Sequence, residues 1–130
     1  ILVMVKIRRS IMTEAQEQRF LFQWAGYAEQ QFPELKLLHH VPNGGKRDAR
    51  TAANLKKEGV KAGVPDIVLP VPRGKYHGLY IELKVGKNKT SLKQKEWISM
   101  LKEQGYFVEV CYGWIEAKQF IEEYLKGVNI

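Results

Sequence analysis

Two β-rich segments joined by a short turn constrain this chain more than any other feature. Residues 66–71 and 78–85 are rich in Ile, Val, Leu and Tyr, and the connection between them contains Pro72 and Gly74. Such a pair of runs is typical of an antiparallel hairpin. A hairpin centred on Gly74 places Asp66 and Glu82 opposite each other, because they are equally distant from the turn.

Asp66, Glu82 and Lys84 form a group with a shared chemistry. Directly opposed residues of an antiparallel pair have Cβ atoms about 4.5–5.5 Å apart. Two carboxylates at that separation repel each other unless a cation lies between them, and Mg²⁺ prefers oxygen ligands. Since side chains alternate along a strand, Lys84 shares a face with Glu82. We therefore predict a metal-assisted phosphodiester hydrolysis, in which Lys84 holds the attacking water or a phosphate oxygen.

A plainer interpretation is that Glu82 and Lys84 mark a solvent-facing strand edge. The residues between and around them, Ile81, Leu83 and Val85, are all apolar. This alternation predicts that the opposite face of the strand is buried, and it favours the catalytic interpretation.

The rest of the chain predicts helices and strands in alternation. We expect helices over 13–31, 48–58, 91–104 and 116–125, and strands over 35–41 and 106–112. Thr13 with Gln16, and Ser91 with Gln94, are capping-box pairs, and Asp48 is a further N-cap. This order predicts an α/β fold with a mixed central sheet flanked by helices.

Apolar residues at helical spacing predict which helix faces are buried. The expected buried residues are Phe20, Leu21, Trp24, Ala28 and Phe32 in the first helix, Trp97, Ile98 and Leu101 in the third, and Ala117, Phe120, Ile121 and Tyr124 in the last. The three Trp residues, Trp24, Trp97 and Trp114, are interpreted as packing residues.

Length and composition predict one domain. The 130 residues fit a single domain over 13–127, with 1–12 as an N-terminal extension. Because the chain does not begin with Met, we expect its first residues to be partly of recombinant origin. No apolar run approaches the roughly 18–20 residues that span a bilayer, and the single Cys111 excludes an internal disulfide. These features favour the cytoplasm, here of a bacterial or phage-infected cell.

Positive charge is concentrated in one part of the chain. The net charge is +7, but residues 43–95 carry 13 basic and 4 acidic residues, a net +9, and the remainder sums to −2. A merely solvated surface would carry interspersed signs, so this excess favours a polyanionic partner. The expected nucleic-acid contacts are Asn43, Lys46, Arg47, Arg50, Lys56, Lys61, Lys87 and Lys89.

Several ordered motifs resemble one known family. Gly63-Val64-Pro65-Asp66 followed at hairpin distance by Glu82-Leu83-Lys84 resembles the PD-(D/E)XK nuclease signature. The additional segments are Pro42-Asn43-Gly44-Gly45, Ser91-Leu92-Lys93-Gln94, Gly105-Tyr106 and Tyr112-Gly113-Trp114. Together they are similar to the VRR-NUC branch of that superfamily, in its stand-alone phage and bacterial form. The letters VRR are absent from the chain, but no catalytic residue is missing.

The resemblance implies a restriction-endonuclease-like core and a Mg²⁺- or Mn²⁺-dependent endonuclease that acts on structured or branched DNA. It is similar to Holliday junction resolvases, which implies a homodimer. It also implies that Asp66, Glu82 and the Leu83 carbonyl bind metal and that Lys84 and Gln94 assist catalysis. An acidic residue on the first helix often joins the site, and Glu14 matches it.

Some of these residues have a second interpretation. Glu14 is also suited to stabilise a helix N-terminus, and Gln94 is suited to close the Ser91 capping box, alone or in addition to a catalytic role. His39, His40 and His77 lack the spacing of a metal site, and His39 and His40 point to opposite faces of a strand.

Two other functions compete with the endonuclease. A non-catalytic nucleic-acid-binding module would keep the fold and the basic surface, but it gains nothing from adjacent carboxylates that repel phosphate. A restriction-type endonuclease needs a sequence-reading element, for which 130 residues leave no spare domain.

Overall fold

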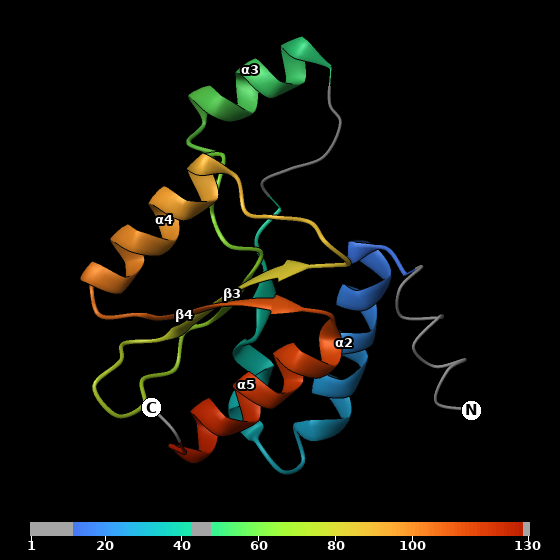
Figure 1. Ribbon diagram of the computed structural model, residues 1–130, viewed down its shortest axis with the longest axis vertical. Helices are drawn as coiled ribbons and strands as arrows, with labels where there is room; N and C mark the ends of the chain where they lie inside the picture. Colours follow the sequence, from blue (N-terminus) through green and yellow to red (C-terminus); the bar gives the residue numbers. More distant parts are fainter. Residues whose placement is uncertain (1–11, 43–47, 129–130) are drawn as a thin grey trace.

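The computed structural model describes residues 12–42 and 48–128, which form one sheet with helices on both of its faces (Figure 1). In chain order the elements are α2 (Glu14–Ala28), the 3₁₀ helix η1 (Pro33–Leu37), β1 (His39–His40), α3 (Ala49–Lys57), β2 (Ile67–Leu69), β3 (Leu79–Lys84), α4 (Leu92–Glu103), β4 (Phe107–Tyr112) and α5 (Trp114–Lys126).

The sheet has the order β1-β2-β3-β4. The first two pairings are antiparallel, and β3 pairs with β4 in parallel through the α4 crossover. Within the hairpin, Ile67 pairs with Ile81 and Leu69 with Leu79. This is the register that the sequence predicts, and the mixed α/β fold is also confirmed.

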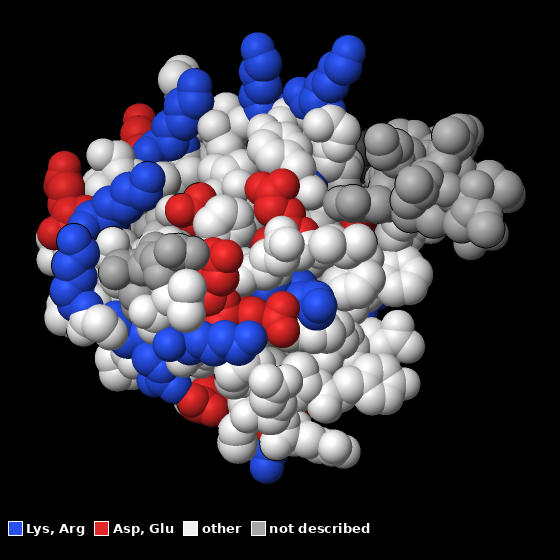
Figure 2. Space-filling view, turned by 60° about the horizontal axis from the view of Figure 1, so that its bottom comes forward, with Lys and Arg blue, Asp and Glu red and all other residues white. Residues whose placement is uncertain are grey.

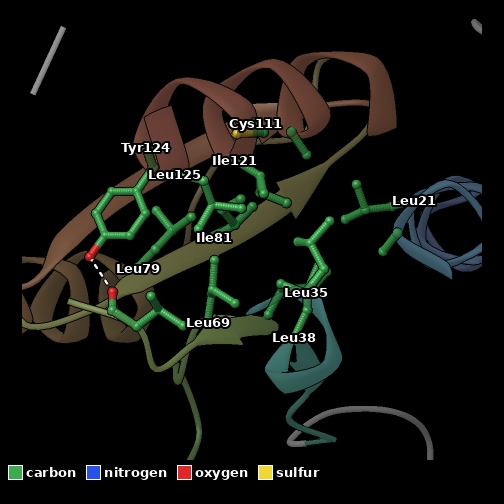
Figure 3. Close-up of a cluster of buried hydrophobic side chains, with 14 of the residues drawn as sticks. Leu21, Leu35, Leu38, Leu69, Leu79, Ile81, Cys111, Ile121, Tyr124 and Leu125 are labelled. Atoms are coloured by element: carbon green, nitrogen blue, oxygen red, sulfur yellow. Dashed lines mark hydrogen bonds between the residues drawn. The ribbon is translucent and has the colours of Figure 1, made fainter. Parts of the chain in front are cut away.

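One face of the sheet carries the hydrophobic core. Leu79, Ile81 and Leu83 of β3 point toward α2 and α5, where they pack with fully buried side chains that include Leu21 and Tyr124. Figure 3 shows this cluster, in which the Tyr124 hydroxyl donates a 2.6 Å hydrogen bond to the Val71 carbonyl oxygen. The bond satisfies a buried polar group that would otherwise be costly.

The other face is covered more thinly. Neither α3 nor α4, both fully described, contains a buried residue. Trp97, Ile98 and Leu101 are half-buried, so the apolar stripe predicted for this helix is present but incompletely covered. Figure 1 shows α3 standing away from the sheet, beyond α4. The two covering layers therefore differ, because α2 and α5 contribute buried residues and α3 and α4 do not.

The strand predicted over 35–41 is mostly wrong. Pro33 starts a 3₁₀ turn that runs to Leu37 and buries Leu35, and only His39 and His40 pair with β2. Proline suits the first position of a helical turn, where its missing N–H has no intrahelical partner. The apolar residues of this segment thus reach the core from a turn instead of a strand.

Helix boundaries and faces also needed correction. The first helix ends at Ala28 rather than at residue 31. Its buried face is Glu17, Leu21 and Ala25, and the predicted core residue Phe20 is 46% exposed, with its ring stacked against Trp114 at 6.1 Å between centroids.

The three predicted N-caps are confirmed. Thr13 and Ser91 form complete capping boxes with Gln16 and Gln94, and the Asp48 side chain accepts a hydrogen bond from Thr51 N–H. The last helix begins at Trp114, two residues earlier than predicted. Among residues 12–42 and 48–128, none of the helices combines the length and hydrophobicity needed to span a membrane.

Candidate metal centre

Asp66 and Glu82 meet at the carboxyl end of β3. Continuing the register by one residue beyond Ile67 and Ile81 places Asp66 opposite Glu82, on the same face of the sheet. The Asp66 carboxyl group contributes to the raised pKa of Glu82, in agreement with this short separation. The pair expected from the spacing of the hairpin is therefore assembled.

The backbone of Leu83 belongs to the same group. Asp66 Oδ2 accepts a 3.0 Å hydrogen bond from Leu83 N–H. In a strand the N–H and C=O of one residue point to the same side, so the Leu83 carbonyl also faces the Asp66 side. The next carbonyl, that of Lys84, faces β4 and accepts from Gly113 N–H at 3.0 Å. The Leu83 carbonyl oxygen therefore points toward the carboxylate pair, and its metal-ligand role stays a prediction.

Glu82 is a buried carboxyl group with an unsatisfied oxygen. Its side chain is 1% exposed, and Oε1 has no hydrogen-bond partner among the described residues. Burial, followed by the neighbouring Asp66 carboxyl group, raises the pKa of Glu82 to about 9, and the positive charge of Lys84 opposes this rise. Such a group is expensive to keep charged without a cation.

Lys84 is the second buried polar side chain of this site, beside Glu82 and the half-buried Asp66. Its side chain is 8% exposed and shares the Glu82 face of β3. No carboxylate in the described part of the chain forms a salt bridge with Lys84. A buried ammonium group that is held near a carboxylate pair, without being neutralised by direct contact, is available to a substrate.

Glu14 lies in the first turn of α2, close enough for its charge to contribute to the raised pKa of Glu82. However, no three His, Cys, Asp or Glu side chains of the described residues converge into a preformed metal site. Direct ligation by Glu14 therefore stays a prediction, and the assembled donor set is Asp66, Glu82 and the Leu83 carbonyl.

This donor set fits a hard divalent cation. All its atoms are oxygens, which Mg²⁺ and Mn²⁺ prefer over nitrogen or sulfur. The Glu82 Oε1 atom, buried without a partner, is the position that such a cation would satisfy. The remaining positions would be filled by water, as is usual for Mg²⁺.

Gln94 closes a helix cap. Its Oε1 accepts a 2.8 Å hydrogen bond from Ser91 N–H, and Ser91 Oγ accepts from Gln94 N–H. The capping interpretation is confirmed. The catalytic role stays a prediction, for which the side-chain amide NH₂ remains as a donor.

A glycine allows the approach to Asp66. Gly63 has φ +94°, and a Cβ at this position would lie 2.6 Å from the Lys93 carbonyl oxygen in the first turn of α4. Glycine is the residue that permits both the backbone conformation and the close contact. The segment that leads to Asp66 therefore packs directly against α4.

The expected nucleic-acid contacts divide into three groups. Arg50, Lys56 and Lys61 are exposed on α3 and the segment after it, and Lys87 and Lys89 are exposed in the loop that follows β3. Asn43, Lys46 and Arg47 lie outside the described residues.

The histidines contact backbone atoms or rings. The ring nitrogens Nδ1 of His39 and His40 lie 2.9 Å from the carbonyl oxygens of Leu37 and Asp66, respectively. His77 packs edge-on against Tyr106. His40 therefore supports the backbone of Asp66, a contact between residues 26 positions apart that no local pattern predicts. Trp24 and Trp114 pack against the core as predicted, and Trp97 is half-buried.

Glu17 is a buried charged residue whose role the sequence does not predict. It is 2% exposed, and its Oε2 accepts a 2.8 Å hydrogen bond from Trp114 N–H at the start of α5. Gly113, the N-cap of α5, offers no side chain, so Glu17 supplies the cap from α2. Its position four residues before Leu21, on the buried stripe, was the available signal.

An open cavity of about 500 Å³ lies at the amino end of β4, and neither Asp66 nor Glu82 lines it. Lys75, Lys102, Tyr106 and Glu109 are among its lining residues. None of the proposed metal ligands borders it, so it is not part of the candidate centre.

Comparison with known proteins identifies the family. The model of the VRR-NUC domain matches residues 5–114. A solved structure described as a VRR_NUC domain protein is 35% identical, with a TM-score of 0.76, and the alignment covers 92% of this chain and 97% of that one. No curated protein matches this chain.

Proposed function

Because the chain belongs to the VRR-NUC domain family, a family of nuclease-type domains, we propose that it is a divalent-metal-dependent endonuclease that hydrolyses phosphodiester bonds in structured or branched DNA. The observation that carries this proposal is the buried Glu82 carboxyl group, which has an unsatisfied oxygen and faces Asp66.

Each residue has a distinct proposed role. Asp66, Glu82 and the Leu83 carbonyl would hold Mg²⁺ or Mn²⁺, which would acidify a water molecule and stabilise the charge that develops on phosphorus. Lys84 would orient that water or hold a phosphate oxygen, because its ammonium group is buried on the same face. Glu14 would add negative charge to the cation site and Gln94 a donor amide.

The basic surface supports DNA as the substrate. Lys87 and Lys89 follow directly on the strand that carries Glu82 and Lys84, and Arg50, Lys56 and Lys61 extend the charge onto α3 and beyond. Neutralised phosphates release condensed counterions, so binding should weaken steeply with salt.

A homodimer is part of the proposal. Resolution of a four-way junction requires two symmetric cuts, and one chain contains one such centre, so a two-fold dimer is the economical arrangement. Light scattering at working concentration should report twice the 15.0 kDa mass of the chain; a monomer would contradict this part of the proposal.

The decisive experiment compares two glutamates. Glu82→Gln should abolish cleavage of a four-way junction in Mg²⁺, and EDTA should have the same effect on the unmodified protein. Glu109→Gln is the matched control, because Glu109 lies on the neighbouring strand and burial also raises the pKa of its carboxyl group. The control should cleave normally. Full activity of the Glu82→Gln variant would refute the proposal.

The competing function is a non-catalytic nucleic-acid-binding module with the same fold. It predicts junction binding without cleavage in Mg²⁺ or Mn²⁺, and little effect of Glu82→Gln on binding, because burial raises the pKa of this carboxyl group to about 9 and keeps it neutral near pH 7. The same cleavage assay therefore separates the two functions.

A further inference from the structure

Tyr112 lies beside the proposed catalytic lysine. It is the last residue of β4, and the parallel register pairs it with Lys84. Neighbouring strands are about 4.8 Å apart, and the side chains of paired residues share a face. The Tyr112 ring is therefore on the Glu82 and Lys84 face of the sheet, at its carboxyl end.

The Tyr112 ring is exposed and yet held in place. It is 39% exposed, while Lys84 next to it is 8% exposed. Its hydroxyl group donates a 3.0 Å hydrogen bond to the Asn88 carbonyl oxygen. The ring is thus fixed at both ends, by the strand and by the loop after β3, while part of its surface remains open to solvent.

Cationic residues flank Asn88, the residue that anchors this ring. Lys87 and Lys89 flank Asn88, and both are exposed. An exposed aromatic ring near basic residues is an arrangement with which proteins hold single-stranded nucleic acid, because bases stack on the ring while the cations follow the phosphates.

We infer that Tyr112 is a stacking platform for an unpaired nucleobase next to the scissile phosphate. The inference rests on the proposed function and makes it more specific. The substrate class becomes DNA in which a base can leave its stack beside the cut, as at a branch point, and continuous duplex becomes the weaker ligand.

The test compares two substitutions at the same position. Tyr112→Phe keeps the ring and removes the hydrogen bond to Asn88, whereas Tyr112→Leu removes both. Affinity is measured in Ca²⁺, which replaces Mg²⁺ without supporting cleavage, for a splayed-arm DNA and for a continuous duplex of the same length. Tyr27→Ala is the control, because Tyr27 is 75% exposed on α2.

Stacking predicts a selective loss. Tyr112→Leu should lower the affinity for splayed-arm DNA by about 5- to 100-fold, as expected for one stacked base, and should change the duplex affinity by less than about twofold. Tyr112→Phe and Tyr27→Ala should retain the preference of the unmodified protein for the splayed-arm DNA.

Other results would overturn the inference. If Tyr112→Phe lost the preference as fully as Tyr112→Leu, the hydroxyl group would be acting by anchoring the loop. If Tyr112→Leu kept the preference, or if the unmodified protein had none, no base would stack on this ring. Failure to bind either DNA would contradict the proposed function as well, so the two failures are distinguishable.

Discussion

One face of the sheet carries the hydrophobic core, and the opposite face carries the polar residues of the candidate metal centre. On one face, α2 and α5 bury Leu79, Ile81 and Leu83. On the other, helices without a buried residue leave room for Glu82, Lys84 and a partly exposed Tyr112. A single strand can serve both purposes because its side chains alternate.

Charge follows the same division. The elements α3 and α4 carry more Lys and Arg than Asp and Glu, whereas α2 and α5 each carry one more acidic than basic residue. Figure 2, in which the lower side of Figure 1 comes forward, shows acidic and basic side chains interspersed. A polyanion is therefore expected on the face that carries α3 and α4.

Two buried glutamates make the contrast concrete. Glu17 belongs to the core face, and its carboxylate is satisfied by the Trp114 N–H. Glu82 belongs to the opposite face and retains an oxygen without a described partner. The first glutamate is satisfied within the fold, and the second keeps the buried oxygen on which the proposed metal site rests.

The largest expected effects come from adjacent residues of β3. Leu83→Ala should lower the free energy of unfolding by about 2–5 kcal/mol, because it leaves a cavity in the core, with unchanged cleavage per folded molecule. Lys84→Met should lower cleavage by about 10²- to 10³-fold with little loss of stability. Urea unfolding and single-turnover cleavage measure both. Equal losses in the free energy of unfolding for Leu83→Ala and Lys84→Met would contradict the assignment of packing to one face and chemistry to the other.

Gly63 tests the seating of the Asp66 segment on α4. Gly63→Ala should lower the free energy of unfolding by about 2–4 kcal/mol. It combines backbone strain with a clash against the Lys93 carbonyl oxygen. Gly59→Ala is the control, since Gly59 has φ +102° but no atom within 4 Å of the added Cβ. Thermal unfolding should show a clearly smaller loss for the control.

Glu82→Gln should stabilise the metal-free protein by about 1–3 kcal/mol at pH 8. The pKa of Glu82 rises from 4.5 to about 9 on folding, so between these values the folded protein binds more protons than the unfolded chain. Stability therefore falls as pH rises through this range, and the substitution should flatten that decline. An unchanged pH profile of urea unfolding would mean that Glu82 is not the buried titrating group.

Glu17→Gln should change the free energy of unfolding least. It should destabilise the protein, whereas Glu82→Gln should stabilise it. It keeps an acceptor for Trp114 N–H but loses the charge that favours the N-terminus of α5, at a cost of about 1 kcal/mol. Mg²⁺ affinity, measured by calorimetry, should stay the same. A loss of Mg²⁺ affinity would show that this carboxylate also serves the metal centre.

The hairpin and its carboxylate pair were predictable because local rules determine them. The turn length fixed the register of Asp66 and Glu82, and the alternation of apolar residues fixed which face carries the hydrophobic core. The capping boxes of Thr13 and Ser91 were predictable for the same reason, since each involves residues three positions apart.

Features that depend on distant contacts were not predictable. Phe20 fits the apolar stripe of α2, but it pairs with Trp114 near the surface. Glu17 would be a solvated helix residue in isolation, and it is buried because α2 packs against α5, whose first N–H group, that of Trp114, donates to its carboxylate. The segment over 35–41 has residues typical of a strand, but Pro33 begins a 3₁₀ helix that runs to Leu37.

The bond between Glu17 and Trp114 joins the first described helix to the last. During synthesis on a ribosome, the carboxylates at 66 and 82 emerge well before β4 and α5, which complete the sheet and its core. Until residue 114 has left the exit tunnel, Glu17 has no donor, and β3 lacks the neighbour that pairs with Lys84. We therefore expect nascent chains that end before this point to bind metal poorly and to be readily digested by proteases.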